Sequence, residues 1–365
     1  MSITARDPGL LESPSGLDFS RTVDRTLVHR RNLTEVFLTD VQRTDGESFA
    51  AAALLPVVHP HYTSHTGTAN RTLDPMLLIE CCRQAETYAA HALFDVEMGA
   101  SFVLRSWSAE LFPDALGQPT YDGTTGGAAP GPVPTGPREL LLSAVTRNAR
   151  RVGGRIRGLD YDFQLWIAGN RVGRVRMEVG YVASVAYVVI RGRGRDGPPP
   201  WSDGLLPVRT GRPVVPAAVG RVNATDTLLL DVVARPDRVA ATLRVPVENV
   251  SLFDHPQDHV PGMVLLEAAR QIAALAARQW DGAAVHTLTM VAMESSFAAY
   301  AELDEAVTVT ATRAEGTQPG PVDAGPPWRR PVEVVFQQAT GEISRVSVVM
   351  ELASGTPSAR AERGG

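Results

Sequence analysis

Residues 263–272 of this chain read Met-Val-Leu-Leu-Glu-Ala-Ala-Arg-Gln-Ile, and residues 76–85 read Met-Leu-Leu-Ile-Glu-Cys-Cys-Arg-Gln-Ala. The two stretches share the pattern Met-x-Leu-x-Glu-x-x-Arg-Gln at one constant offset of 187 residues. A string of this length does not recur at a fixed offset by chance. The sequence therefore predicts two copies of one domain, each built around a helix that carries Glu, Arg and Gln.

The size and charge of the chain exclude several classes of protein. With 365 residues, 44% of them hydrophobic, it can bury two ordinary cores. A net charge of −5 does not favour binding to nucleic acid or to an anionic membrane, both of which attract positively charged proteins. No apolar run approaches the ~20 residues that span a bilayer, and the N-terminus lacks the apolar core of a signal peptide. We expect a cytoplasmic protein without nucleic-acid or membrane partners, either a monomer with an internal pseudo-dimer or a homodimer.

The basic residues and cysteines limit the chemistry further. All 35 basic residues are Arg, so a Schiff-base lysine, a P-loop lysine and covalent pyridoxal phosphate are excluded. Cys81 and Cys82 are adjacent on a predicted helix and badly placed to form a disulfide. The second copy has Ala268 and Ala269 there, which favours space-filling residues over nucleophiles. No cofactor and no metal site is expected.

Each copy is predicted to consist of strands, one long apolar helix and then more antiparallel strands, an α+β unit with the helix packed on the sheet. Asp74-Pro75 is typical of a helix start, with an N-cap followed by Pro at the first helical position. In the first copy we expect a helix over 74–93 and strands over 27–39, 49–58, 101–111, 139–147, 155–167 and 171–183. In the second copy we expect a helix over 261–280 and strands over 228–233, 239–245, 287–297, 306–313, 332–338 and 344–352.

These elements suggest domain boundaries. Residues 1–25 form an irregular N-terminal segment, and 26–190 form the first repeat, with a mobile Gly/Pro loop at 114–137. An Arg- and Pro-rich linker over 191–212, whose arginines are expected to be solvated, leads to the second repeat at 213–352. Residues 353–365 are predicted to form a disordered tail.

The stretch His255-Pro-Gln-Asp-His259-Val-Pro-Gly262-Met263 before the second helix resembles the loop-and-helix signature of the hotdog fold. The chain is more specifically similar to the A-factor biosynthesis (AfsA-type) γ-butyrolactone synthases, which are tandem hotdogs. The first half carries the matching strings Leu27-Val-His-Arg30, His59-Pro60 and Asp74 through Gln84. The resemblance spans roughly residues 26–352 and implies a tandem double hotdog, each repeat a long central helix wrapped by an antiparallel β-sheet.

The resemblance also implies an activity. Members of that family transfer a β-ketoacyl group from an acyl carrier protein, or here alternatively from coenzyme A, to a hydroxyl of dihydroxyacetone phosphate. The ester then cyclises to a phosphorylated butenolide, a precursor of signalling molecules that switch on antibiotic production. The alternatives are a hotdog hydroxyacyl-thioester dehydratase or thioesterase, and a non-catalytic regulator that binds an acyl group or lactone.

The repeated helix positions are the first candidates for the site. Residues at i, i+3 and i+4 share one helix face, so Glu80, Arg83 and Gln84 lie together, as do their second-copy equivalents. One interpretation is a buried ion pair that fixes the helix to its neighbour. The other is a catalytic carboxylate with an Arg that orients it or binds phosphate. The family resemblance favours catalysis, with Glu267 ahead of Glu80.

The loop before the second helix supplies the remaining candidates. His259 is a candidate base or substrate-orienting residue, although a loop-bracing role is equally compatible with its position. The N–H groups at Gly262 and Met263 open the helix and can polarise a thioester carbonyl. The predicted catalytic residues are Glu267, Glu80 and His259. The predicted substrate-binding residues are Arg270, Arg83, Gln271, Gln84, Gly262, Met263, His255, His59, Asp74 and Arg30.

Overall fold

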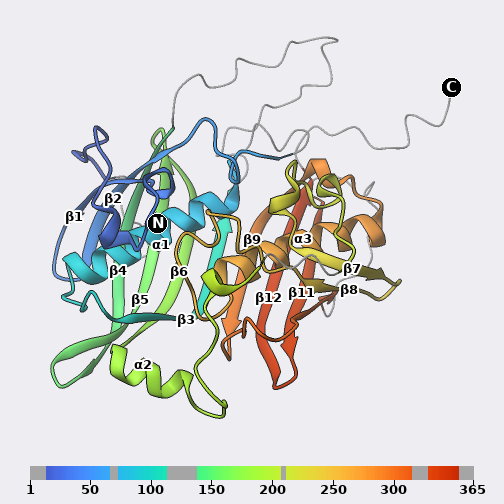
Figure 1. Ribbon diagram of the computed structural model, residues 1–365. Coiled ribbons are helices and arrows are strands. Elements are labelled where there is room, and N and C mark those ends of the chain that lie inside the picture. Colours follow the sequence, from blue (N-terminus) through green and yellow to red (C-terminus); the bar gives the residue numbers. More distant parts are fainter. Residues whose placement is uncertain (1–13, 66–72, 113–137, 207–210, 315–327, 353–365) are drawn as a thin grey trace, which may run out of the picture.

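The computed structural model describes residues 14–65, 73–112, 138–206, 211–314 and 328–352 (Figure 1). The predicted loop at 114–137 and the predicted tail at 353–365 lie outside the described residues.

Twelve strands in the described chain form one antiparallel sheet. Their burial alternates along the strand, as in β11, because one face of the sheet is covered by helices. The strands are β1 Leu38–Arg43, β2 Ser48–Leu55, β3 Ser101–Leu111, β4 Arg138–Val152, β5 Arg155–Ile167, β6 Asn170–Val182, β7 Leu229–Ala234, β8 Arg238–Leu243, β9 Leu288–Phe297, β10 Thr308–Arg313, β11 Arg329–Gln338 and β12 Gly341–Leu352.

The strand order is symmetric about the middle of the sheet. It runs β1-β2-β4-β5-β6-β3 and then β9-β12-β11-β10-β8-β7, so the second half mirrors the first. β3 and β9 join the halves through pairs such as Trp107 with Ser295 and Glu110 with Ala292. The single sheet brings the two halves of the chain edge to edge.

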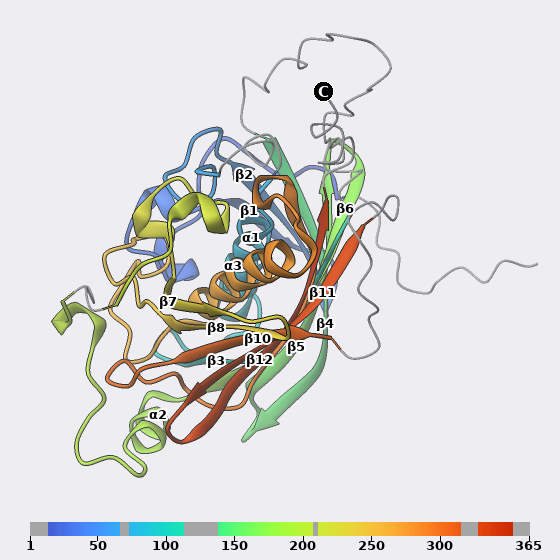
Figure 2. The same ribbon diagram turned by 90° about the vertical axis from the view of Figure 1, so that its right-hand side faces the viewer.

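Two long helices, α1 (Pro75–Ala92) and α3 (Gly262–Asp281), lie on the same face of the sheet (Figure 2). Both are almost wholly buried, which explains why their sequences are apolar on nearly every side. The Asp74 side chain accepts a hydrogen bond from the Met76 N–H at the start of α1, as predicted. None of the described helices has both the length and the apolar character needed to cross a membrane.

The strand predicted over residues 27–39 is wrong. The segment contains two short 3₁₀ turns, η1 (Arg25–Val28) and η2 (Leu33–Glu35), and β1 begins only at Leu38. Asp24 caps the first turn by accepting from the Thr26 N–H, and His29 ends it in the left-handed conformation with φ 50°. Local side-chain capping therefore outweighs the β propensity of this segment.

The expectation that the arginines at the start of the linker are solvated is wrong for Arg191 and Arg195, whereas Arg193 is exposed. A short helix, α2 (Ser184–Arg191), ends at Arg191, which is only 5% exposed. Its guanidinium forms ion pairs with Asp258 and Glu302, and Arg195 pairs with Glu302 and Asp304. The carboxylates come from a distant part of the chain, so the local sequence of the linker does not reveal them.

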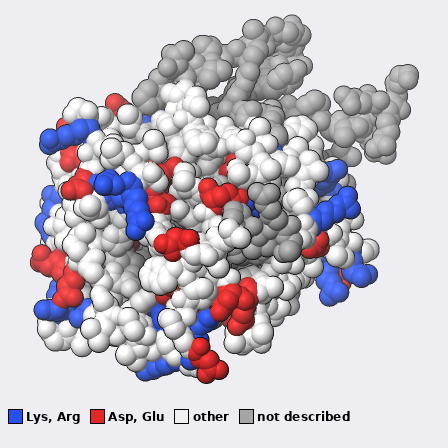
Figure 3. Space-filling view, viewed as in Figure 1, with Lys and Arg blue, Asp and Glu red and all other residues white. Residues whose placement is uncertain are grey.

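The loop that precedes each long helix packs against the other half. In the first loop, His61 Nδ1 lies 2.7 Å from Asp226 Oδ1, next to the 3₁₀ turn η7 (Ala224–Asp226). In the second loop, the Asp254 carboxylate accepts from the N–H of Asn32 at 3.0 Å. These contacts connect the two halves in addition to the sheet that they share. On the face shown in Figure 3, acidic and basic side chains are interspersed rather than gathered in one large patch.

Candidate active site

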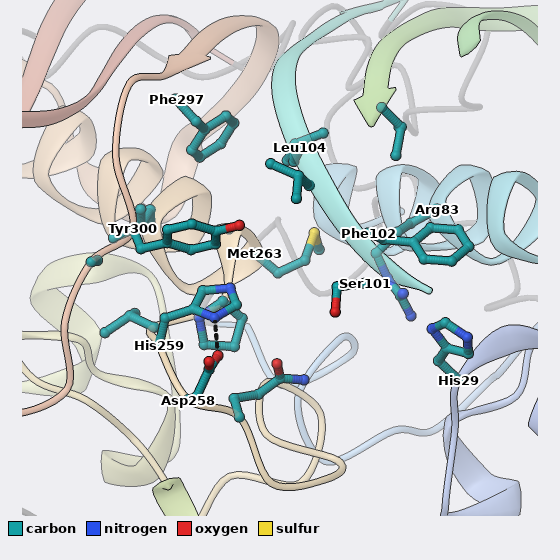
Figure 4. Close-up of a pocket in the computed structure, with 18 of the residues that line it drawn as sticks. His29, Arg83, Ser101, Phe102, Leu104, Asp258, His259, Met263, Phe297 and Tyr300 are labelled. Carbon is teal, nitrogen blue, oxygen red and sulfur yellow. Dashed lines mark hydrogen bonds and ion pairs between the residues drawn. The ribbon is translucent and has the colours of Figure 1, made fainter. Parts of the chain in front are cut away.

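A cavity of about 550 Å³ lies where the two halves meet (Figure 4). One half contributes residues of α1, β3 and β6, and the other contributes the start of α3 with the loop before it. Its volume is within the usual range for small-molecule sites. Because both halves line it, the cavity depends on their pairing.

His259 and Asp258 form a hydrogen-bonded pair in the cavity wall. His259 Nδ1 lies 2.7 Å from Asp258 Oδ1. Burial alone would raise the pKa of Asp258, but hydrogen bonds from His259, Tyr187 and Arg191 hold it well below its usual range. An ionised carboxylate only accepts hydrogen bonds, so Nδ1 of His259 carries the proton. In the neutral ring, Nε2 then has a free lone pair, as a general base requires.

Helix α2 holds this pair in place. The Tyr187 hydroxyl donates to Asp258 Oδ1 at 2.8 Å, and Arg191 Nε donates to Oδ2 at 3.0 Å. The Tyr300 ring packs edge-on against the His259 ring, with centroids 5.0 Å apart (Figure 4). Sequence reasoning named His259 but did not give its partners a role. The adjacency of Asp258 and His259 was the available signal.

The N-terminus of α3 opens into the same cavity. Gly262 and Met263 line it, Pro261 provides no side-chain cap, and within the described chain neither N–H has a hydrogen-bond partner. A Cβ at Gly262 would lie 3.2 Å from Leu104 Cδ2, so glycine permits the close approach of α3 to β3. Two free N–H groups at the positive end of a helix can stabilise a developing oxyanion.

The N-terminus of α1 is closed by comparison. Its first residue, Pro75, has no N–H, and Asp74 caps the N–H of Met76 at 2.8 Å. The Asp74 carboxylate also bonds to His65 Nε2 at 2.8 Å and faces Arg221 Nη1 at 3.3 Å. The two helix starts are equivalent in sequence position, but only that of α3 has free donors.

Basic side chains line the opposite part of the cavity, among them Arg83, Arg30, His255 and His29. Nε of Arg30 and Nδ1 of His255 are buried atoms without a hydrogen-bond partner among the described residues, and His255 Nδ1 lies 3.6 Å from Asp254 Oδ2. Burial and the nearby His91 lower the pKa of His29 to about 3, so this ring is neutral. The two guanidinium groups in the lining, those of Arg83 and Arg30, suit an anionic ligand.

Glu80 organises the two arginines and does not itself line the cavity. Its carboxylate accepts from Arg83 Nε at 2.7 Å and Nη2 at 2.8 Å, from Gln84 Nε2 at 2.7 Å, and from Arg30. Burial would raise the pKa of Glu80, but these arginines lower it to about 2. Gln84 also donates to the Glu35 carbonyl and accepts from the Phe37 N–H, which ties α1 to the start of β1.

Glu267 repeats this arrangement in the second half. It accepts from Arg270 Nε at 2.8 Å, Gln271 Nε2 at 2.7 Å and Arg221 Nε at 3.0 Å. Burial opposes ionisation, but Arg221 and Arg270 lower the pKa of Glu267 to about 2. Gln271 donates to the Asp226 carbonyl and accepts from the Leu228 N–H. The repeated Glu-x-x-Arg-Gln string is therefore a clamp between each helix and its first strand.

The predicted residues separate into two groups. The cavity brings together His259, His255, Gly262, Met263, Arg83 and Arg30. The residues outside its lining are Glu80, Glu267, Arg270, Gln84, Gln271, His59 and Asp74. His59 is buried with its Nε2 3.3 Å from Glu35 Oε1. In the described chain, no group of three or more His, Cys, Asp or Glu residues is arranged to hold a metal ion.

Replacing both Cys81 and Cys82 with Ala is expected to leave the protein folded and active. Both thiols are free, buried and absent from the cavity lining. Burial raises their pKa values well above the usual range, so little reactive thiolate forms at neutral pH. Activity assays after treatment with a thiol-blocking reagent check this expectation. A stable acyl adduct on either sulfur would contradict it.

Known proteins match both halves of the chain. The family model of the A-factor biosynthesis hotdog domain matches residues 12–183 and 207–340. A protein of Streptomyces virginiae named 2-oxo-3-(phosphooxy)propyl 3-oxoalkanoate synthase is 35% identical, with 78% of this chain and 84% of that protein covered. A protein of the same name from Streptomyces coelicolor is 29% identical, with 82% and 83% covered.

Among solved structures, a putative oleoyl thioesterase from Lactobacillus plantarum is similar with a TM-score of 0.47 and 9% identity. The match covers 85% of this chain and 98% of that one.

Proposed function

Since the chain belongs to the A-factor biosynthesis hotdog family, we propose that it transfers a 3-oxoacyl group from a thioester to dihydroxyacetone phosphate. The donor thioester is carried by an acyl carrier protein or by coenzyme A. One observation carries this proposal. A single cavity combines a His–Asp pair, an uncapped helix N-terminus and an arginine pair, which are the groups that the reaction needs.

In the proposed reaction His259 is the general base. Its Nε2 takes the proton from the acceptor hydroxyl as the hydroxyl oxygen attacks the thioester carbonyl carbon. The negative charge then develops on the carbonyl oxygen, where the N–H groups of Gly262 and Met263 stabilise it. The carbon–sulfur bond breaks, and His259 returns the proton to the leaving thiolate. Asp258 fixes the tautomer and stabilises the transient imidazolium.

The acceptor phosphate is assigned to Arg83 and Arg30, which both line the cavity. Arg83 uses Nε and Nη2 to bind Glu80, which leaves Nη1 for a ligand in the cavity. A phosphate oxygen there would form a charge-assisted hydrogen bond. Glu80 is then a positioning residue, because it fixes both arginines.

The proposed roles of Glu80 and Glu267 as catalytic bases stay a prediction from sequence. Both carboxylates are saturated with hydrogen bonds from arginine and glutamine and have low pKa values. Such a carboxylate is a weak base at neutral pH. Their surroundings favour positioning of Arg83, Arg30, Arg221 and Arg270 over proton transfer.

The reaction is tested by incubating the protein with a 3-oxoacyl thioester and dihydroxyacetone phosphate. Mass spectrometry should detect the phosphorylated 3-oxoacyl ester or its cyclised product, together with one free thiol per ester formed. Free 3-oxo acid without ester would indicate a thioesterase. No turnover with tight donor binding would indicate a binding protein.

The repeat supplies a matched pair of variants for the phosphate site. We expect Arg83→Lys to raise the KM for dihydroxyacetone phosphate about tenfold, because a single ammonium cannot serve both Glu80 and a phosphate. Arg270→Lys alters the same local motif outside the cavity lining, so its KM should stay near that of the wild type. Steady-state kinetics with varied acceptor measures both. Equal effects in the two variants would place the phosphate elsewhere.

We further propose that the chain is a tandem double hotdog with repeats at 26–190 and 213–352, joined by the segment 191–212. The mirrored strand order and the two equivalent helix clamps support this division. The cavity is then the site formed where two hotdog units meet.

A further inference from the structure

Tyr300 lines the cavity beside the proposed thioester position and has no role in the proposed transfer step. The Val260 N–H donates to the Ala301 carbonyl at 2.8 Å, so the segment that carries Tyr300 is joined to the loop immediately before α3. A Cβ on Gly262 would lie 3.6 Å from Phe297 Cε1, at the other end of the same segment. Tyr300 therefore belongs to the wall around the start of α3.

Three neighbours hold the Tyr300 ring in one orientation. The rings of His259 and Tyr187 pack edge-on against it, with centroids 5.0 and 6.0 Å away. The Arg191 guanidinium carbon lies 4.5 Å from the centroid of the ring, in a cation–π contact. A phenol ring fixed in this way presents its hydroxyl at a defined place, and Figure 4 shows that this hydroxyl points into the cavity.

The Tyr300 hydroxyl is a free hydrogen-bond donor. It has no hydrogen-bond partner among the described residues and is accessible from the cavity. The neighbouring Tyr187 hydroxyl, by contrast, is used by Asp258. Burial raises the pKa of Tyr300, so its proton stays in place at neutral pH. Because Leu104 and Phe297 in the nearby lining are apolar, a ligand oxygen in this part of the cavity would find its donor in Tyr300.

The chemistry of a 3-oxoacyl donor places an oxygen in this part of the cavity. One carbon separates its two carbonyl groups, so the 3-oxo group lies close to wherever the thioester is bound. In the proposed reaction the thioester oxygen is at the N–H groups of Gly262 and Met263, and the thioester carbon is within reach of the hydroxyl that His259 deprotonates. Tyr300 contacts His259 from the same wall. A 3-oxo group buried there without a donor would lose its hydrogen bonds to water, which is unfavourable.

We propose that Tyr300 selects 3-oxoacyl donors, because its O–H donates a hydrogen bond to the 3-oxo oxygen. An unsubstituted acyl chain has no oxygen at this position and leaves the hydroxyl without a partner. Tyr300 is thus a specificity-determining residue and transfers no proton in the reaction. The inference rests on the proposed acyl transfer, since that reaction places the thioester at Gly262.

Binding of non-transferable donors tests the inference separately from the reaction. The probes are two amide analogues of acyl-pantetheine, the thioester group that coenzyme A and acyl carrier proteins share, in which an N–H replaces the sulfur. One carries a 3-oxoacyl chain and the other an unsubstituted acyl chain of the same length. Calorimetry should show the 3-oxoacyl amide binding about tenfold tighter to the wild type, the equivalent of one added hydrogen bond.

Tyr300→Phe isolates the proposed hydrogen bond, because it removes the hydroxyl and keeps the ring with its contacts to His259 and Arg191. The tenfold preference should disappear in this variant, since the 3-oxoacyl amide loses its donor while the unsubstituted amide loses nothing. Ser101→Ala is the matched control. Ser101 is at the start of β3 and also lines the cavity with a hydroxyl side chain. The control should keep the wild-type preference.

A preference that survives in Tyr300→Phe would overturn the inference, because a residue that only supports His259 leaves the ratio of the two affinities unchanged. Equal binding of the two amides to the wild type would also overturn it, as would a preference that is lost in Ser101→Ala. If neither amide binds to the wild type, the proposed acyl-transfer function fails as well.

Discussion

Replacement of His259 by Ala is expected to lower kcat by about two to four orders of magnitude, the usual range for loss of a general base. The KM for the acyl donor should change little, because the proposed role of the imidazole is proton transfer. The lining of the cavity is otherwise retained, so the melting temperature should stay close to that of the wild type. Steady-state kinetics and thermal unfolding of the purified variant measure these three quantities.

Two further variants test whether the loss of kcat is specific to the His259–Asp258 pair. Asp258→Asn should also lower kcat, since Asn no longer fixes the protonated Nδ1 of His259 or stabilises its charged form. Glu267→Gln changes a buried carboxylate outside the cavity, so most of its effect should be on the melting temperature. The opposite ranking, with kcat lost in Glu267→Gln and retained in His259→Ala, would make the carboxylate the base.

Much of the architecture was predictable because its signals are local. The repeated helix string, the Asp74-Pro75 start and the alternating strand segments each depend on neighbouring residues. The helices α1 and α3 and the strands β2 to β12 follow these signals closely, whereas helix α2 was not predicted. The segment over 27–39 failed for a local reason as well, because Asp24 and His29 set turns that a propensity pattern does not contain.

The site was less predictable because its residues are joined by tertiary contacts. Asp258 is held by Tyr187 and Arg191, which precede it by about seventy residues. The repeat drew attention to Glu80 and Glu267, yet repetition is equally expected of a clamp that every copy of the fold needs. The asymmetric features proved more informative, since the helix start is open at Gly262 and capped at Asp74.

Arg30 and Arg221 have comparable contacts in the two halves, but in the described chain only the half of Arg30 has a cavity beside its arginine. Each arginine binds the glutamate of the neighbouring helix clamp. Arg30 lines the cavity. Arg221 is 0% exposed and also contacts the His61 carbonyl and Asp74. Its guanidinium therefore fills the position, at the start of α1, that corresponds to the cavity at the start of α3. The His-containing loop at 59–65, together with the carboxylates of Asp74 and Asp226, closes that place with hydrogen bonds and ion pairs.

We therefore expect Arg221→Met to destabilise the protein by about 3–5 kcal/mol, because it leaves the buried carboxylates of Glu267 and Asp74 short of a partner. Arg30→Met should cost less stability, since Glu80 keeps Arg83 and lies next to a cavity that water can enter. Its main effect should instead be a higher KM for dihydroxyacetone phosphate. Chemical denaturation and acceptor kinetics on both variants distinguish the two roles. A KM effect in Arg221→Met without loss of stability would mean that the second place is also a working site.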